Sequence, residues 1–135
     1  MREKKAFLRC SSCTVFSRPE HFLNRLRREG FTIALDDFGS GYSSLRYLLC
    51  MPVDLVKFDI SMVRSLDETG RQALFVEDLA RMIKDAGYKL VAEGIESEAL
   101  LQRVTALGFS HAKGFHIGRP VPLTSLRTVS LRAVS

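Results

Sequence analysis

The sequence has no tryptophan, only three cysteines and no apolar run long enough to span a membrane. Its first residues are basic, but the apolar stretch that follows ends after Leu8, which is too short for a secretion signal, so we expect a cytoplasmic protein. Cys10 and Cys13 form a Cys-x-x-Cys pair, but no second cysteine pair or matched histidine pair is present to complete a structural zinc site. No strand pattern precedes Cys10, so a redox motif is not favoured either. We expect Cys10, Cys13 and Cys50 to be reduced thiols without a function.

Long runs of like charge are also absent, which argues against an arm that binds nucleic acid. The formal net charge is nevertheless +5 and the pI about 9.4, so the surface favours anionic partners such as nucleotides and phosphates. We expect no nucleic-acid partner and no membrane partner. The 135 residues are enough for one domain with a hydrophobic core.

Apolar periodicity predicts helices that alternate with strands. The expected helices are residues 18–29, 43–50, 71–86 and 97–107, and the expected strands are 31–35, 54–58, 89–92 and a weaker one near 111–115. The apolar face of the 71–86 helix is expected to contain Leu74, Phe75, Leu79, Met82 and Ile83. This alternation indicates βα units around a parallel sheet, so the fold class is α/β.

Polar residues gather where the expected strands end. In chain order they are Asp36 and Asp37, Lys57 and Asp59, Glu93 and Glu96, and then His111, Lys113 and His116. The carboxyl ends of parallel strands meet at one edge of the sheet, where α/β proteins bind their ligands. Adjacent carboxylates repel each other unless a metal ion shares them, and hard oxygen ligands suit Mg²⁺ or Mn²⁺. Such ions typically act on phosphate esters.

Each of these residues also has a purely structural interpretation. The aspartates could bind loop amides, Lys57 and Asp59 could form a structural ion pair, and the two glutamates could flank the start of a helix. The loop Gly39-Ser40-Gly41 is by itself a weak sign of a phosphate cradle. Their joint placement at successive strand ends favours a metal and phosphate site.

Four segments, taken together, resemble one known family. They are ALDDFGSGYSSLRYL, PVDLVKFDISMV, LVAEGIES and AKGFHIGRP, in this order. Over roughly residues 18–122 the chain resembles the EAL-domain family of cyclic di-GMP phosphodiesterases. The resemblance implies a modified (β/α)8 barrel, Mg²⁺ or Mn²⁺ as cofactor, cyclic di-GMP as ligand, and its hydrolysis to linear pGpG.

The resemblance also implies roles for individual residues. Asp36 and Asp37 match the paired metal ligands. Lys57 and Glu93 match the catalytic residues, with Lys57 near the metal-bound water and phosphate and Glu93 as general base or metal ligand. The matching residues of the substrate side and of the family's mobile loop are Asp59, Gly39, Ser40, Gly41, Glu96 and Lys113. Ser40 stands where threonine is usual, and Lys113 where glutamine is usual.

The chain departs from the family in what it lacks. A full barrel takes about 250 residues, so 135 residues imply a partial (β/α)8 barrel of about four parallel βα units. The family's Glu-Ala-Leu motif and asparagine ligand are expected to be missing, and residues 8–13 contain no carboxylate where the family has a glutamate ligand. We therefore expect weak metal binding. The expected segments are an unmatched one at 1–17, a partial domain at 18–122 and a tail at 123–135.

An incomplete barrel leaves sheet edges and apolar faces uncovered, so we expect a homodimer or a protein partner that completes it. The leading prediction is a cyclic di-GMP phosphodiesterase domain that is truncated and inactive alone. Two alternatives stay open: a non-catalytic module that binds cyclic di-GMP or a protein, and a gene remnant without a role.

Overall fold

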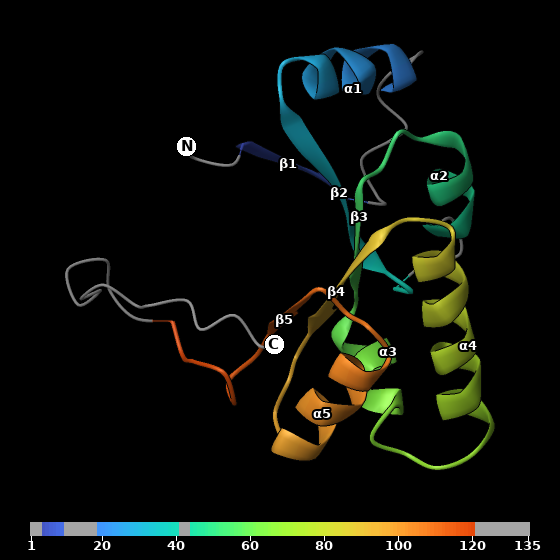
Figure 1. Cartoon of the computed structure of the whole chain (residues 1–135), viewed down its shortest axis with the longest axis vertical. Coiled ribbons are helices and arrows are strands. Elements are labelled where there is room, and N and C mark those ends of the chain that lie inside the picture. The colour runs from blue at the N-terminus through green and yellow to red at the C-terminus, as the bar shows by residue number, and fades with distance from the viewer. Residues whose placement is uncertain (1–3, 10–18, 41–43, 121–135) are drawn as a thin grey trace.

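The backbone forms one parallel sheet whose strands are joined by helices (Figure 1). The computed structural model describes residues 4–9, 19–40 and 44–120, so Cys10, Cys13, Gly41 and the expected tail at 123–135 lie outside the described residues. The five strands follow one another across the sheet in chain order. They are β1 (Lys4–Arg9), β2 (Phe31–Phe38), β3 (Leu55–Phe58), β4 (Lys89–Glu93) and β5 (His111–Lys113). The helices are α1 (Pro19–Arg28), α2 (Ser44–Cys50), α3 (Ile60–Ser65), α4 (Arg71–Asp85) and α5 (Glu98–Ala106).

All eight expected helices and strands are present, with ends that differ by a few residues. Two further elements, β1 and α3, were not predicted. β1 reads KKAFLR and has no clear alternation of apolar and polar residues. The expectation that no strand precedes Cys10 is therefore wrong. α3 has only six residues, too few for a helical period to show in the sequence.

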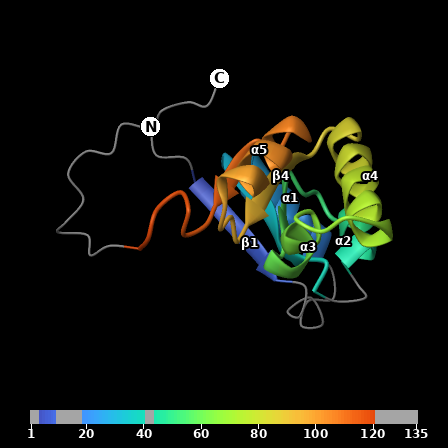
Figure 2. The same cartoon turned by 90° about the horizontal axis from the view of Figure 1, so that it is seen from below.

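One face of the sheet carries the main hydrophobic core. Its strand residues are Leu35, Phe38, Val56, Phe58, Leu90 and Ala92, and they pack against α2, α3, α4 and α5. The ring of Phe58 lies at the centre of the core, with ring centroids 5.3 Å from Phe38 and 5.2 Å from Phe109. Figures 1 and 2 show α2, α4 and α5 on the same side of the sheet.

The buried face of α4 differs from the expected one. Residues Leu74, Phe75 and Met82 are more than half exposed. Ile83 is buried and Leu79 packs partly against the core, as expected, and the other buried residues of the helix are the smaller Ala73, Val76 and Ala80. The core-facing side of α4 is therefore turned away from Leu74, Phe75 and Met82 toward Ala73, Val76 and Ala80.

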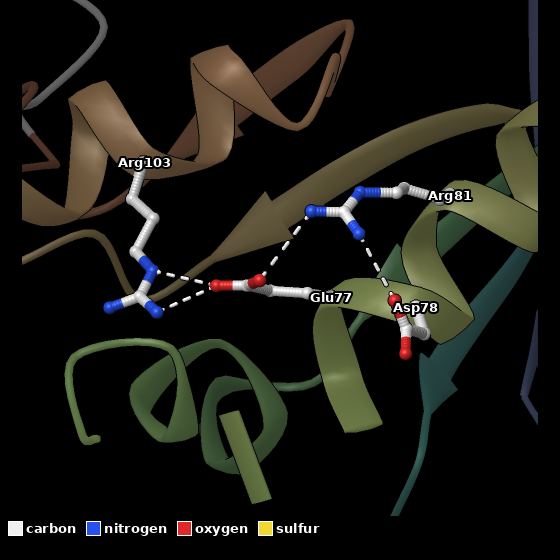
Figure 3. Close-up of polar contacts among 4 residues, drawn as sticks. All are labelled: Glu77, Asp78, Arg81 and Arg103. Carbon is white, nitrogen blue, oxygen red and sulfur yellow. Dashed lines mark hydrogen bonds and ion pairs between the residues drawn. The ribbon is translucent and has the colours of Figure 1, made fainter. Parts of the chain in front are cut away.

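An ion-pair network joins α4 to α5 (Figure 3). Arg103 of α5 donates two hydrogen bonds to Glu77 Oε1, at 3.1 Å from Nε and 2.6 Å from Nη2. Arg81 lies on the other side of Glu77, 3.6 Å from Oε2, and also bonds to Asp78. The Glu77 side chain is only 14% exposed, so this network fixes α5 beside α4 from within the interface.

The opposite face of the sheet, here called the open face, carries a small buried cluster of Ala34, Leu55 and Val91. In the described part of the chain no helix covers this face (Figure 2), and no further strand pairs with β1 or β5 at the two edges. The architecture is that of a barrel segment with four βα units and a fifth strand. Among the described helices, none has both the length and the apolar character needed to cross a membrane.

Candidate functional site

Three charged side chains lie on the open face near the carboxyl ends of β2, β3 and β4. Asp36, Lys57 and Glu93 each come two residues after a member of the buried cluster on that face. Side chains two residues apart in a strand point to the same side of the sheet, so all three share the open face. Because the strands are parallel, their carboxyl ends lie side by side at the same end of the sheet, and this end is here called the rim.

A bulge in β2 brings a second aspartate, Asp37, to the rim. Three steps along β2, from Leu35 to Phe38, span the same length as two steps along β3. The extra residue breaks the alternation, so Leu35 and Phe38 both lie in the helix-side core and the two aspartates between them both lie outside it. The backbone φ of Asp37 is +55°, in the left-handed region that aspartate tolerates better than most residues.

Lys57 binds the carboxylates from the middle strand. Its Nζ donates to Asp36 Oδ1 and lies 2.9 Å from Glu93 Oε1. All three side chains are about 15% exposed or less. Burial by itself lowers the pKa of Lys57, but hydrogen bonds to Asp36 and Glu93 and the charges of both carboxylates outweigh it and raise the pKa. Lys57 is therefore a charged lysine at neutral pH.

The rim carboxylates have the spacing of a metal site. One oxygen from each of Asp36, Asp37 and Glu93 can lie within 4.8 Å of the other two, and all three side chains are partly buried. Three carboxylate oxygens without sulfur or imidazole suit a hard ion such as Mg²⁺ or Mn²⁺. Lys57 already bonds to two of these carboxylates, so it would compete with an ion for their oxygens.

The loop after β2 is held by short-range contacts. The Ser40 backbone N–H and hydroxyl both donate to the Asp37 carbonyl, at 3.1 and 2.8 Å. Gly39 has φ +101°, and a Cβ added there would lie 1.8 Å from the sulfur of Met62 in α3. Glycine is therefore required for α3 to pack beneath this loop. Gly41, the third residue of the expected loop, lies outside the described residues.

Asp59 and Glu96, two expected substrate-side residues, do not belong to the carboxylate group at the rim. Asp59 is the N-cap of α3, and its Oδ2 accepts from the Ser61 backbone N–H at 3.0 Å. Glu96 pairs with Arg64 of α3 at 2.8 Å in an exposed position. The structural ion pair between Lys57 and Asp59 that we considered is not formed, since Lys57 pairs with Asp36 and Glu93 instead.

The last strand brings Lys113 beside the rim and His111 two residues behind it. Lys113 is in register with Glu93, and His111 with Val91. His116 follows after the strand and its Nε2 lies 3.0 Å from Glu98 Oε2. Hydrogen bonds from His116 and Gln102 lower the pKa of Glu98, which is fully solvated.

A Glu-Ala-Leu tripeptide does occur in the chain, at Glu98-Ala99-Leu100, contrary to the expectation that none is present. It lies downstream of Glu93, in the first turn of α5. Glu98 is exposed and bonds to His116, and it is not part of the carboxylate group at the rim. The tripeptide is therefore not a counterpart of the family's upstream motif.

On the other side of the rim, the β1 position in register with Asp36 is Arg9. The position in register with Asp36 is therefore not a carboxylate residue. The family resemblance pointed to residues 8–13 as this neighbour, and the register of β1 singles out Arg9. The bulge at Asp37 was missed, although two consecutive carboxylates at the end of an apolar strand were its visible sign.

Comparison with known proteins gives one consistent family. A sequence model of the EAL domain matches residues 8–120. The chain is 39% identical over 108 residues to the "Cyclic di-GMP phosphodiesterase PdeB" of Shewanella oneidensis, covering 80% of this chain and 13% of that protein. It is 38% identical over 104 residues to the "Bifunctional diguanylate cyclase/cyclic di-GMP phosphodiesterase MucR" of Pseudomonas aeruginosa, covering 77% and 15%. The chain thus spans a small part of these relatives.

Solved structures agree with the fold. The EAL domain of Mycobacterium smegmatis DcpA superposes with a TM-score of 0.77 at 31% identity, covering 87% of this chain and 53% of that one. A complex of the Klebsiella pneumoniae protein BlrP1 with manganese and cyclic di-GMP gives a TM-score of 0.75 at 31% identity, covering 86% and 30%. The predicted partial (β/α)8 barrel is confirmed, and the chain spans about half of the isolated domain.

Proposed function

The chain belongs to the EAL domain family, and on that premise we propose that its rim binds cyclic di-GMP and supplies half of a metal-dependent phosphodiesterase site. The observation that carries this proposal is the group of three carboxylates around Lys57 at the carboxyl ends of the strands. Relatives of known structure support the ligand class, since one was solved with manganese and cyclic di-GMP.

Asp36, Asp37 and Glu93 are the residues that would hold Mg²⁺ or Mn²⁺. Such an ion would supply Lewis-acid polarisation of a phosphoryl oxygen and a water that is more acidic than bulk water. The charged Lys57 lies between two of the carboxylates, where its N–H groups can donate to a phosphoryl oxygen when a ligand displaces one carboxylate. With three protein oxygens and competition from Lys57, we propose that the metal binds weakly.

We further propose that turnover needs a second chain. The chain spans about half of an EAL domain, and the strand beside β2 has Arg9 in register with Asp36 instead of a carboxylate. Both sheet edges and the open face are available in the described part of the fold. A second copy that pairs edge to edge, or another protein with barrel strands, would cover both.

The test is hydrolysis of cyclic di-GMP in the presence of Mn²⁺, followed by chromatography of pGpG. The expected result for the chain alone is binding with little or no turnover. If turnover is found, Glu93→Gln is expected to lower it at least about 100-fold, whereas Glu68→Gln, an exposed residue in the loop before α4, leaves it unchanged. A chain that neither binds nor hydrolyses cyclic di-GMP contradicts the proposed function.

A non-catalytic binding module is the second candidate. It is favoured by the residue type in register with Asp36, because arginine at that position of β1 is not a metal-ligand type. If this candidate is correct, the chain binds cyclic di-GMP but does not hydrolyse it, both at low concentration and at concentrations at which copies of the chain associate.

A further inference from the structure

The register of the last two strands places a second lysine at the rim. Lys113 of β5 is the partner of Glu93 in β4, and its neighbour Ala112 packs against the helix-side core. Alternation along the strand therefore puts Lys113 on the open face, the same face as Glu93. Neighbouring parallel strands lie about 4.8 Å apart, so the Lys113 side chain starts directly beside the carboxylate group.

The backbone holds Lys113 in this position. The N–H of Ile95 donates to the Lys113 carbonyl at 3.1 Å, and the N–H of His116 donates to the Ile95 carbonyl at 3.1 Å. Between these bonds lies Gly114, where an added Cβ would lie 2.1 Å from the Ile95 carbonyl oxygen. Only glycine permits this approach, so the end of β5 is clamped to the loop that follows Glu93.

Lys113 differs from Lys57 in what surrounds its ammonium group. Lys57 is partly buried and bound to two carboxylates. Lys113 is exposed, and no carboxylate of the described residues lies within salt-bridge distance of it. The rim thus has one cation committed to its own carboxylates and a second cation, on a fixed backbone, that can accept an outside anion.

We propose that Lys113 is a phosphate contact that lets the rim hold a phosphodiester ligand without a divalent metal ion. Three carboxylates alone would repel an anionic ligand, and in a metal-bound site the ion would supply the opposing charge. Here Lys57 and Lys113 supply two positive charges at the carboxyl ends of the two strands that flank β4. This inference rests on the proposed function, because the ligand is cyclic di-GMP. It adds that Lys113 makes binding possible without a metal ion.

The experiment measures the affinity for cyclic di-GMP by isothermal titration calorimetry with the full chain, in EDTA and in Mn²⁺. In EDTA the wild type is expected to bind, and Lys113→Gln is expected to bind about 10-fold more weakly. The plot of log affinity against log salt concentration is expected to be shallower by about one unit of slope in this variant, as for the loss of one phosphate contact. Lys113→Arg is expected to keep most of the affinity.

The matched control is Lys89→Gln, because Lys89 is an exposed lysine on the open face at the other end of β4. It is expected to leave the affinity in EDTA unchanged. Equal affinities and equal salt slopes for wild type and Lys113→Gln overturn the role of Lys113 but leave the proposed function intact. If the wild type binds cyclic di-GMP in Mn²⁺ but not in EDTA, the role of Lys113 is likewise overturned and the proposed function stands. A wild-type chain that binds cyclic di-GMP in neither buffer overturns both.

Discussion

Replacing Lys57 by methionine tests whether this lysine stabilises the rim. The change keeps most of the side-chain volume and removes one positive charge from among three carboxylates. At 4.8 Å, the distance within which the carboxylate oxygens lie, two unit charges repel by about 3.5 kcal/mol at an effective dielectric constant of about 20. Removal of one partner from a buried ion pair costs about 3–5 kcal/mol. We expect Lys57→Met to lower the free energy of unfolding by about 3 kcal/mol at neutral pH.

Urea denaturation followed by circular dichroism measures this change. The control is Lys89→Met, an exposed residue for which a change below about 0.5 kcal/mol is expected. Addition of Mn²⁺ is expected to recover part of the loss in Lys57→Met, because the three carboxylates are then free of the competing lysine. If Lys57→Met unfolds at the same urea concentration as the wild type, the rim is not held by this lysine and the reasoning is refuted.

The contribution of Lys57 also has a defined pH range. The folded protein raises the pKa of Lys57 above its ordinary value of 10.5. The stabilisation is therefore fully present below pH 10.5 and is lost as the pH rises through the higher, folded-state pKa. The difference in unfolding free energy between wild type and Lys57→Met is expected to shrink above this pH. A difference that stays constant into strongly alkaline solution contradicts the assignment.

Three further substitutions test the contacts that support the site, each by urea denaturation. Glu77→Gln is expected to cost about 1–2 kcal/mol, because a largely buried carboxylate loses its charge beside two arginines, whereas the exposed Asp78→Asn costs less than about 0.5 kcal/mol. Gly39→Ala is expected to cost about 1–2 kcal/mol because of its φ of +101° and the clash with Met62, and a second change, Met62→Ala, should recover only the steric part. Asp59→Ala removes the N-cap of α3 and is expected to cost about 1 kcal/mol, whereas Asp59→Asn, which can still cap the helix, is expected to cost much less.

The sequence was sufficient to predict the features that depend on periodicity. Alternating apolar segments predicted the βα order, and the carboxyl ends of the strands predicted where Asp36, Lys57 and Glu93 would meet. Both inferences need only the direction of the strands and the two-residue period of their side chains. The family resemblance added the expected barrel, which the solved EAL domains confirm.

Features that depend on packing were not predictable. In α4 the apolar pattern placed Ile83 in the core, but it also assigned Phe75 there, and Phe75 is exposed while Val76 beside it is buried. The partners of Lys57 depend on which neighbouring strands flank it, and Asp59, near in sequence, turned out to cap a helix. The bulge at Asp37 is a mismatch in register between two strands, so the adjacent aspartates could hint at it but could not establish it.

Because of the bulge in β2, the loss of a single codon could alter the site and leave the fold intact. Deletion of either aspartate codon would leave two steps between Leu35 and Phe38, which matches the neighbouring strand and restores a regular pleat. Both core residues would keep their places, and β2 would contribute one carboxylate to the rim instead of two, beside Glu93 of β4. A lineage could therefore abandon metal chemistry by one in-frame deletion while the folded barrel segment persists.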